Sequence, residues 1–236
     1  MLMMISLLFS LSDDFVKAVS ARDIATVNTM LQSDPTLVDA HNPRGVSVTL
    51  LAMFATPKGA EGFLDPKSND VLQTVLAHKP KFGLYETAAF GTAEQLDVLL
   101  KEDPKRVAER TSFGWTPLHI AAFAGNTATT ELLINRGADV NSRAHSKFRN
   151  TPLQTALLSG QYATAKLLLD HGADVLVRQA EGITPLHEAA QSGREDLVKL
   201  MLSYGAEITS RADDGSTPLD LAKKAKHDNV VALLTK

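Results

Sequence analysis

The sequence predicts an all-α solenoid of about seven helix–turn–helix repeats joined by short β-hairpin fingers. Two tripeptides carry this prediction, because each recurs at a fixed period. Thr-Pro-Leu begins at residues 116, 151, 184 and 217, in steps of 35, 33 and 33, and Gly-Ala-Asp/Glu begins at residues 137, 172 and 205. The period extends toward the N-terminus, since residues 32–38 match residues 101–107 at a separation of 69.

The first helix of each repeat is predicted to begin at the Thr-Pro pair. In the fourth repeat, the hydroxyl of Thr116 can cap the helix and Pro117 suits its first turn. Leu118, Ala121 and Ala122 then fall on one face, where the alanines allow close packing. We therefore expect a short helix with one buried face in each repeat.

A second helix and a projecting loop complete the repeat. Gly125 ends the first helix, and Leu132 and Leu133 are predicted to bury the second helix. Gly137 can take the left-handed backbone conformation that closes this second helix. The residues between Gly137 and the next Thr-Pro pair then form the finger.

The same register places seven repeats over nearly the whole chain. They start near residues 13, 47, 82, 116, 151, 184 and 217, within a single domain of residues 12–236 that follows an apolar tail at residues 1–11. The second repeat has extra residues between its helices, which predicts an insertion loop at residues 56–70. A self-packed or mobile loop is the favoured interpretation. A binding role for its apolar Phe63 and Leu64 is the alternative.

The motifs resemble those of a known family. Residues 116–122 and 184–190, each followed by Gly-Ala-Asp/Glu, are similar to the ankyrin-repeat pattern. Residues 34–35, 45–52 and 85–91 in the degenerate first repeats look like those of small bacterial ankyrin-repeat proteins. The resemblance implies a non-catalytic module that binds a protein partner.

The composition excludes several classes of protein. The chain has 24 Lys and Arg against 27 Asp and Glu, a net charge of −3, which does not indicate a nucleic-acid or anionic-lipid partner. It contains no cysteine, which excludes disulfides, thiolate nucleophiles and cysteine-based metal sites. No apolar run reaches the roughly 18 residues that a membrane-spanning helix needs.

No motif for catalysis, cofactor binding or metal binding stands out. His119 and His187 occupy the repeat's own His position, where bonds within and between repeats are expected. His187 lacks the second His of a zinc-protease helix, and Asp213 and Asp214 lack the other ligands of a calcium loop. We therefore expect no enzyme, no cofactor and no metal.

The resemblance implies that a partner binds along a concave face of fingers and first helices. Because Trp and other aromatic residues usually anchor interfaces, this face is predicted to centre on Trp115 in repeats three to five. In the alternative, Phe90 and Phe123 pack between helices and Trp115 shields its own finger. The predicted partner-binding residues are Phe90, Ser112, Phe113, Trp115, Phe123, Lys147, Phe148, Leu158, Glu181, Ile183 and Gln191.

We expect a cytoplasmic monomer that binds a protein and no nucleic acid. In the alternative, residues 1–11 act as a secretion signal or membrane anchor, which would make the protein secreted, periplasmic or membrane-associated. No Lys or Arg precedes Lys17 and no small-residue cleavage site is present, which argues against a signal.

Overall fold

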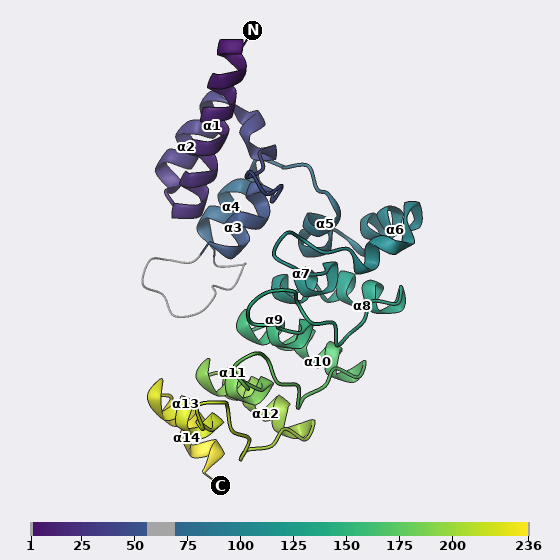
Figure 1. Ribbon diagram of the computed structural model, residues 1–236, viewed down its shortest axis with the longest axis vertical. Helices are drawn as coiled ribbons and strands as arrows, with labels where there is room; N and C mark the ends of the chain where they lie inside the picture. The colour runs from purple at the N-terminus through teal and green to yellow at the C-terminus, as the bar shows by residue number, and fades with distance from the viewer. Residues whose placement is uncertain (1, 56–68, 236) are drawn as a thin grey trace. The chain divides into compact units, whose positions relative to one another are not determined.

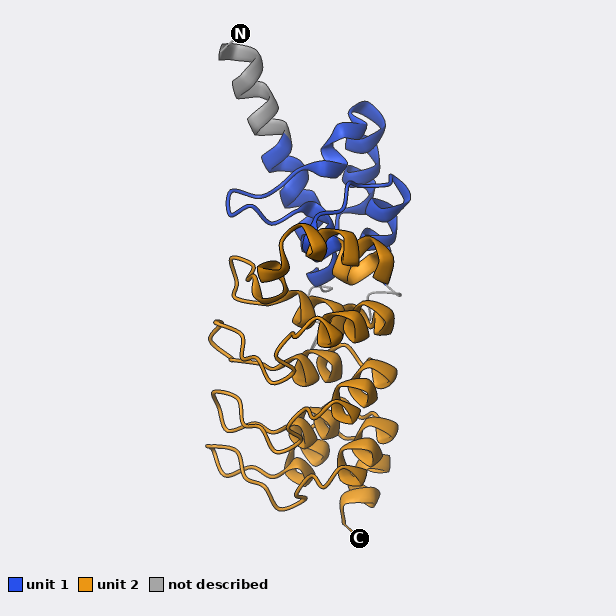
Figure 2. Ribbon diagram, turned by 90° about the vertical axis from the view of Figure 1, so that its right-hand side faces the viewer, with its two compact units in different colours: residues 1–86 blue, residues 87–236 orange. Residues whose placement is uncertain are grey.

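The computed structural model describes the backbone of residues 2–55 and 69–235, with side chains from residue 12 onward. The chain divides into two compact units, unit 1 of Met1–Glu86 and unit 2 of Thr87–Lys236 (Figure 2). The single domain predicted over residues 12–236 stays a prediction. Residues 56–68 of the predicted insertion loop lie outside the described residues, and the side chain of Asn69 caps the helix that follows them.

Unit 1 is a packed group of short helices that follow one longer helix. Its elements are α1 (Leu2–Ala21), α2 (Ile24–Ser33), η1 (Pro35–Asp39), α3 (Val48–Phe54) and α4 (Asp70–Ala77). Helix α1 packs against α2 and α3, and α4 packs against α2 and α3. Phe15, Leu31, Met53 and Leu72 are among its most deeply buried side chains. The backbone of residues 2–11, predicted as a tail, is the first part of α1.

Unit 2 is a solenoid of helix pairs (Figure 1). Helix α5 (Leu84–Phe90) runs across the boundary between the units, and the elements that follow are α6 (Ala93–Glu102), η3 (Pro104–Ala108), α7 (Pro117–Ala124), α8 (Thr127–Asn135), α9 (Pro152–Leu158), α10 (Tyr162–Asp170), α11 (Pro185–Gln191), α12 (Glu195–Ser203), α13 (Pro218–Lys224) and α14 (Asp228–Leu234). The first helices pack in series as α7, α9, α11 and α13, and the second helices as α6, α8, α10, α12 and α14. Within the described residues, no helix combines the length and the hydrophobicity needed to cross a membrane.

Helix α7 begins where the Thr-Pro motif predicts. Thr116 is its N-cap, the Thr116 hydroxyl accepts a hydrogen bond from the backbone N–H of His119, and Pro117 occupies the first turn. The His119 side chain accepts in return from the backbone N–H of Thr116, which completes a capping box. The same arrangement starts α9 at Thr151 and α13 at Thr217. The predicted role of the Thr-Pro pair is therefore confirmed.

Glycines end the helices of the fourth repeat as predicted. Gly125 follows α7 with φ of 76°, and Gly137 follows α8 with φ of 86°. Both angles lie in the left-handed region, which glycine enters without the steric penalty that a Cβ atom brings.

The core of unit 2 lies between its two layers of helices. Leu118, Ile120 and Phe123 from α7 and Leu133 from α8 have no exposed surface. Ala122 is equally buried, and its small side chain lets α7 and α9 pack closely. The fingers are therefore held on a well-packed base.

The fingers are single turns and not β-hairpins. Among the described residues no strand is present, and the isolated bridge between His41 and Ser47 lies in unit 1. Each finger of unit 2 closes with one backbone hydrogen bond across its base, which leaves no second residue pair to extend a ladder. The helical solenoid is confirmed, while the predicted hairpins are not observed in this part of the chain.

Candidate functional site

Four fingers project from unit 2 in a row, which we call the finger row (Figure 2). They are the fourth finger (residues 111–115), the fifth (144–150), the sixth (179–183) and the seventh (212–216). In each finger, the backbone N–H of the first residue donates to the carbonyl of the last at 2.8 to 3.0 Å. The base of every finger is therefore fixed.

Neighbouring fingers are also hydrogen-bonded to each other. The backbone N–H of His145 donates to the carbonyl of Gly114 at 3.2 Å, which joins the fifth finger to the fourth. The N–H of Ala180 donates to the carbonyl of Phe148 at 3.1 Å, and a bond of 3.0 Å joins the sixth finger to the seventh. The finger row is thus one connected backbone surface.

Arginines recur at the base of every finger. Arg110 donates from Nη1 to the carbonyls of Gly114 and Arg143 at 2.9 and 3.1 Å, and Arg143 donates from Nη1 to the carbonyl of Arg178 at 2.8 Å. These residues and Arg211 follow the repeat in steps of 33, 35 and 33. They were not predicted, although their periodicity is visible in the sequence.

The repeat histidines hold each first helix to the next finger. His119 Nδ1 accepts from the backbone N–H of Thr116 at 3.3 Å, and Nε2 donates to the carbonyl of Asn150 at 3.0 Å. His187 makes the equivalent bond to the carbonyl of Ser216 at 3.1 Å. Burial lowers the pKa of His119 to about 4 and also lowers the pKa of His187, so both imidazoles are neutral at pH 7. The predicted bonds within and between repeats are confirmed.

Two predicted anchor residues are buried and cannot offer their rings to a partner. Phe123 has no exposed surface, and Trp115 is only 7% exposed. The Trp115 ring lies 5.8 Å from the Phe113 ring and 5.7 Å from the Phe123 ring, measured between centroids. The rings fold inward because packing them removes apolar surface from water. This corrects the prediction that the site centres on Trp115, and it favours the alternative in which both rings pack internally.

Phe148 is the exposed aromatic residue of the finger row. It lies on the fifth finger, half of its surface is accessible, and Lys147 Nζ lies 5.7 Å from the centre of its ring. The fifth finger is two residues longer than the others, which accounts for one step of 35 in the repeat. This extra length was a signal in the sequence that marked the fifth finger as different.

The other predicted residues differ in accessibility. The exposed ones are Ser112, Lys147, Glu181 and Gln191. The half-buried ones are Phe90, Phe113, Leu158 and Ile183. Of the predicted set, the finger row therefore brings together Ser112, Lys147, Phe148 and Glu181 as exposed side chains and Phe113 and Ile183 as half-buried ones.

Comparison with known proteins identifies the fold. The family model described as ankyrin repeats (3 copies) matches residues 84–179 and again residues 176–236, together more than half of the chain. The chain belongs to the ankyrin-repeat family. It is also similar to delta-latroinsectotoxin-Lt1a of Latrodectus tredecimguttatus, 48% identical over 48 residues. That match spans 20% of this chain and only 4% of the toxin.

The ankyrin-repeat family is typically non-enzymatic. Among the described residues, no group of three or more His, Asp or Glu side chains is placed to hold a metal ion. The repeat histidines are committed to structural hydrogen bonds, as described above.

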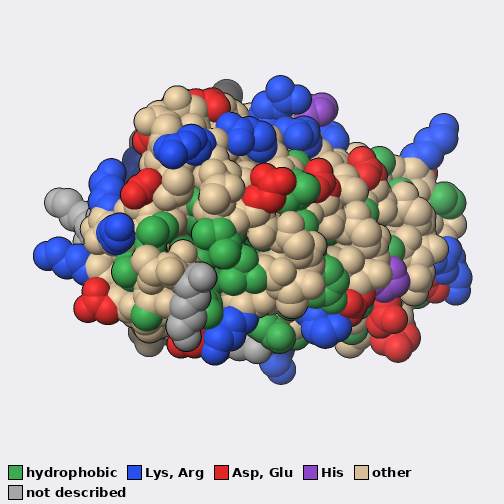
Figure 3. Space-filling view, turned by 90° about the horizontal axis from the view of Figure 1, so that it is seen from below, with side chains coloured by type: hydrophobic (Ala, Val, Ile, Leu, Met, Phe, Trp, Pro, Cys, Tyr) green, Lys and Arg blue, Asp and Glu red, His purple; other side chains and the backbone are tan. Residues whose placement is uncertain are grey.

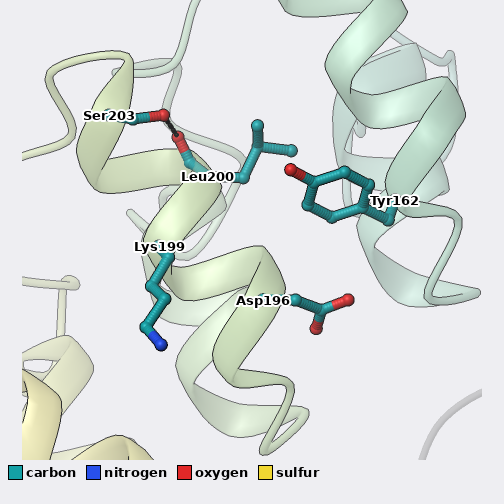
Figure 4. Close-up of a pocket in the computed structure, with 5 residues that line it drawn as sticks. All are labelled: Tyr162, Asp196, Lys199, Leu200 and Ser203. Atoms are coloured by element: carbon teal, nitrogen blue, oxygen red, sulfur yellow. Dashed lines mark hydrogen bonds between the residues drawn. The ribbon is translucent and has the colours of Figure 1, made fainter.

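An open hollow of about 480 Å³ lies between ankyrin helices α10 and α12 (Figure 4). Its lining residues are Tyr162, Asp196, Lys199, Leu200 and Ser203. Asp196 pairs with Arg194 at 2.7 Å, and Lys199 pairs with Glu195 at 2.5 Å. The Ser203 hydroxyl donates to the carbonyl of Leu200 at 2.8 Å. Asp196, Lys199 and Ser203 of the hollow are therefore each paired with a neighbouring group.

One carboxyl group is buried in the sixth ankyrin repeat. Glu188 lies on α11 at the position that Ile120 occupies in the fourth repeat. Gln179 donates to Oε1 at 3.1 Å, and Oε2 has no hydrogen-bond partner among the described residues. Burial raises the pKa of Glu188 well above its ordinary value.

Proposed function

We propose that this protein binds a protein partner through the finger row, with Phe148 as the central anchor. Ankyrin repeats are generally protein–protein interaction modules. The observation that carries the proposal is the half-exposed ring of Phe148 on a finger whose backbone is fixed on both sides. Exposed aromatic residues at rigid positions are the usual energetic anchors of interfaces.

Preorganisation supports this placement. The fifth finger bonds through His145 to the fourth finger and through the carbonyl of Phe148 to the sixth. A partner would therefore order few groups of this chain on binding, which lowers the entropic cost of association. Ser112, Glu181 and Ile183 lie on adjacent fingers and would supply the polar and apolar surroundings of Phe148.

The charges on the surface favour a protein over a nucleic acid as the partner. Basic and acidic side chains lie side by side on the face shown in Figure 3, and the net charge of the chain is −3. A nucleic-acid surface would need clustered cations without neighbouring carboxylates.

An alanine substitution with a matched control tests the proposal. Phe148→Ala removes the exposed ring, while Val98→Ala shortens a side chain on α6 that is 57% exposed and lies outside the finger row. Each tagged variant is expressed in the native cells, and co-purifying proteins are quantified by mass spectrometry. We expect one or more proteins recovered with the wild type and with Val98→Ala to be lost with Phe148→Ala. Equal recovery with both variants would place the binding surface elsewhere.

The predicted cytoplasmic location and monomeric state stay predictions. The alternative role of residues 1–11 as a signal or anchor concerns side chains outside the described residues. N-terminal sequencing of the mature protein distinguishes a processed chain from an intact one, and analytical ultracentrifugation measures the oligomeric state.

A further inference from the structure

Arg149 stands where the other fingers of unit 2 have glycine. Its φ is 57°, and the equivalent glycines Gly114, Gly182 and Gly215 have φ of 86°, 71° and 85°. The left-handed region is unfavourable for a residue with a Cβ atom, and single residues other than glycine, asparagine and aspartate seldom occupy it. The fifth finger thus keeps a charged side chain at a position where its backbone favours glycine.

The cations of the fifth finger have no acidic partner. Lys147 and Arg149 on the finger, and Arg143 just before it, are all exposed, and no carboxylate among the described residues lies within ion-pair distance of them. Arg178, the next cation along the row, does have an acidic partner, because its Nη2 lies 3.4 Å from Asp213 Oδ1. The fifth finger is therefore a local surplus of positive charge on a chain that is negative overall.

An aromatic side chain adjoins these charges. Phe148 stands between Lys147 and Arg149 in the sequence, and half of its surface is exposed. A segment that places an apolar side chain on this ring would bring its neighbouring side chains close to Lys147, whose Nζ lies 5.7 Å from the ring centre, and toward Arg149, the next residue. Carboxylates there would form charge-assisted hydrogen bonds with Arg149.

Acidic side chains lie on the next two fingers of the row. Glu181 and Asp213 are exposed on the sixth and seventh fingers, which are bonded to each other through Asp213 N–H and the Glu181 carbonyl. A long polyanion that followed the row would meet both carboxylates, whereas a short acidic segment on the fifth finger would meet at most Glu181, whose neighbour Ala180 is hydrogen-bonded to Phe148. The charge pattern therefore favours a peptide over a nucleic acid.

We propose that the fifth finger, residues 144–150, is a docking site for an acidic protein segment that carries an apolar side chain beside its carboxylates. Arg149 is the specificity-determining residue, and its charge explains why this finger departs from glycine. This inference rests on the proposed function, since it names the partner chemistry of the same finger row.

The test selects a random peptide library displayed on phage against the wild-type chain. The most enriched peptide is then synthesised, and its affinity is measured for the wild type, Arg149→Gly, Arg149→Ala and the control Arg178→Ala. Thermal unfolding of each variant is followed by circular dichroism. A labelled single-stranded oligonucleotide serves as the competing polyanion.

We expect enriched peptides to carry Asp or Glu beside a Leu or an aromatic residue. Arg149→Gly and Arg149→Ala should each weaken binding about tenfold. Arg149→Gly should also unfold at the same temperature as the wild type or higher, because it relieves the left-handed strain. Arg178→Ala should leave the affinity nearly unchanged.

Several results would overturn the inference. Enriched peptides that lack acidic residues would contradict the acidic partner, and so would an affinity that Arg149→Gly leaves unchanged. Either result would leave the proposed function of the finger row in place. Displacement of the peptide by the oligonucleotide would indicate that the fifth finger binds a nucleic acid and not an acidic protein segment. Unfolding of Arg149→Gly at a lower temperature would give Arg149 a structural role. A selection that enriches no peptide at all would count against the proposed function itself.

Discussion

The rings of Trp115 and Phe123 pack against each other with their centroids 5.7 Å apart, although one residue lies on a finger and the other on α7. Phe123 is fully buried and Trp115 is nearly so. The aromatic residues of the fourth repeat therefore tie the fourth finger to its own helix. The buried rings of Trp115 and Phe123 thus support the finger row from inside.

Phe123→Ala is expected to destabilise the protein by about 3–5 kcal/mol, because it leaves a cavity where a large side chain was fully buried. Trp115→Ala should also lower the free energy of unfolding, since its ring packs on that of Phe123. Urea unfolding followed by circular dichroism measures both. The exposed Val98→Ala variant is the control, and a similar midpoint for all three would contradict the burial of the rings.

His119 predicts a loss of stability in acid. Burial lowers its folded-state pKa to about 4, below its unfolded value of 6.5. The neutral, buried imidazole therefore contributes fully to the free energy of unfolding above pH 6.5. About 3 kcal/mol of this contribution is lost as the pH falls toward 4. The free energy of unfolding measured across this range should fall less in His119→Gln.

Gln is chosen because the fifth repeat already uses it in this role. Gln154 Oε1 accepts from the backbone N–H of Thr151 at 3.2 Å, and its Nε2 donates to the carbonyl of Ile183 at 3.5 Å. His171→Gln, at an exposed position, serves as the control. If the free energy of unfolding falls equally with pH in the wild type and in His119→Gln, this histidine is not the source of the acid sensitivity.

Glu188 predicts the opposite dependence on pH. Burial raises its folded-state pKa above the ordinary value of 4.5, so the unfolded chain ionises first as the pH rises. Stability should therefore decline from about pH 4.5 upward until the folded carboxyl also ionises. Glu188→Leu, which copies Leu221 of the seventh repeat, should remove this decline and stabilise the protein at pH 8 by about 1–3 kcal/mol.

Chemical denaturation at pH 4, 6 and 8 measures the effect of Glu188→Leu. Glu131→Leu, an exposed position on α8, provides the matched control. The prediction is wrong if Glu188→Leu and the wild type keep the same difference in stability at all three pH values.

The sequence allowed most of the fold to be predicted, because short local signals control it. Thr116 caps its helix, Gly125 and Gly137 close theirs, and the period of the Thr-Pro-Leu motif sets the stacking of the repeats. These signals act within a few residues of one another. Their effect can be predicted without knowing how the helices pack against each other.

The candidate site was harder to predict, because it depends on where rings point after packing. The sequence placed Trp115 and Phe123 at positions that face partners in the family, and nothing local indicated that both would turn inward. The charged features, by contrast, are visible in the sequence. The two extra residues of the fifth finger and Arg149 in place of glycine both break the repeat.

The most direct test of binding through the finger row is site-specific photocrosslinking in the native cells. A photoreactive phenylalanine analogue is placed at position 148, and in a control at position 98, which is similarly exposed on α6. The proposal predicts a discrete crosslinked product from position 148 that contains one partner protein and is absent from position 98. A product from position 98 alone, or no product from position 148, would contradict it.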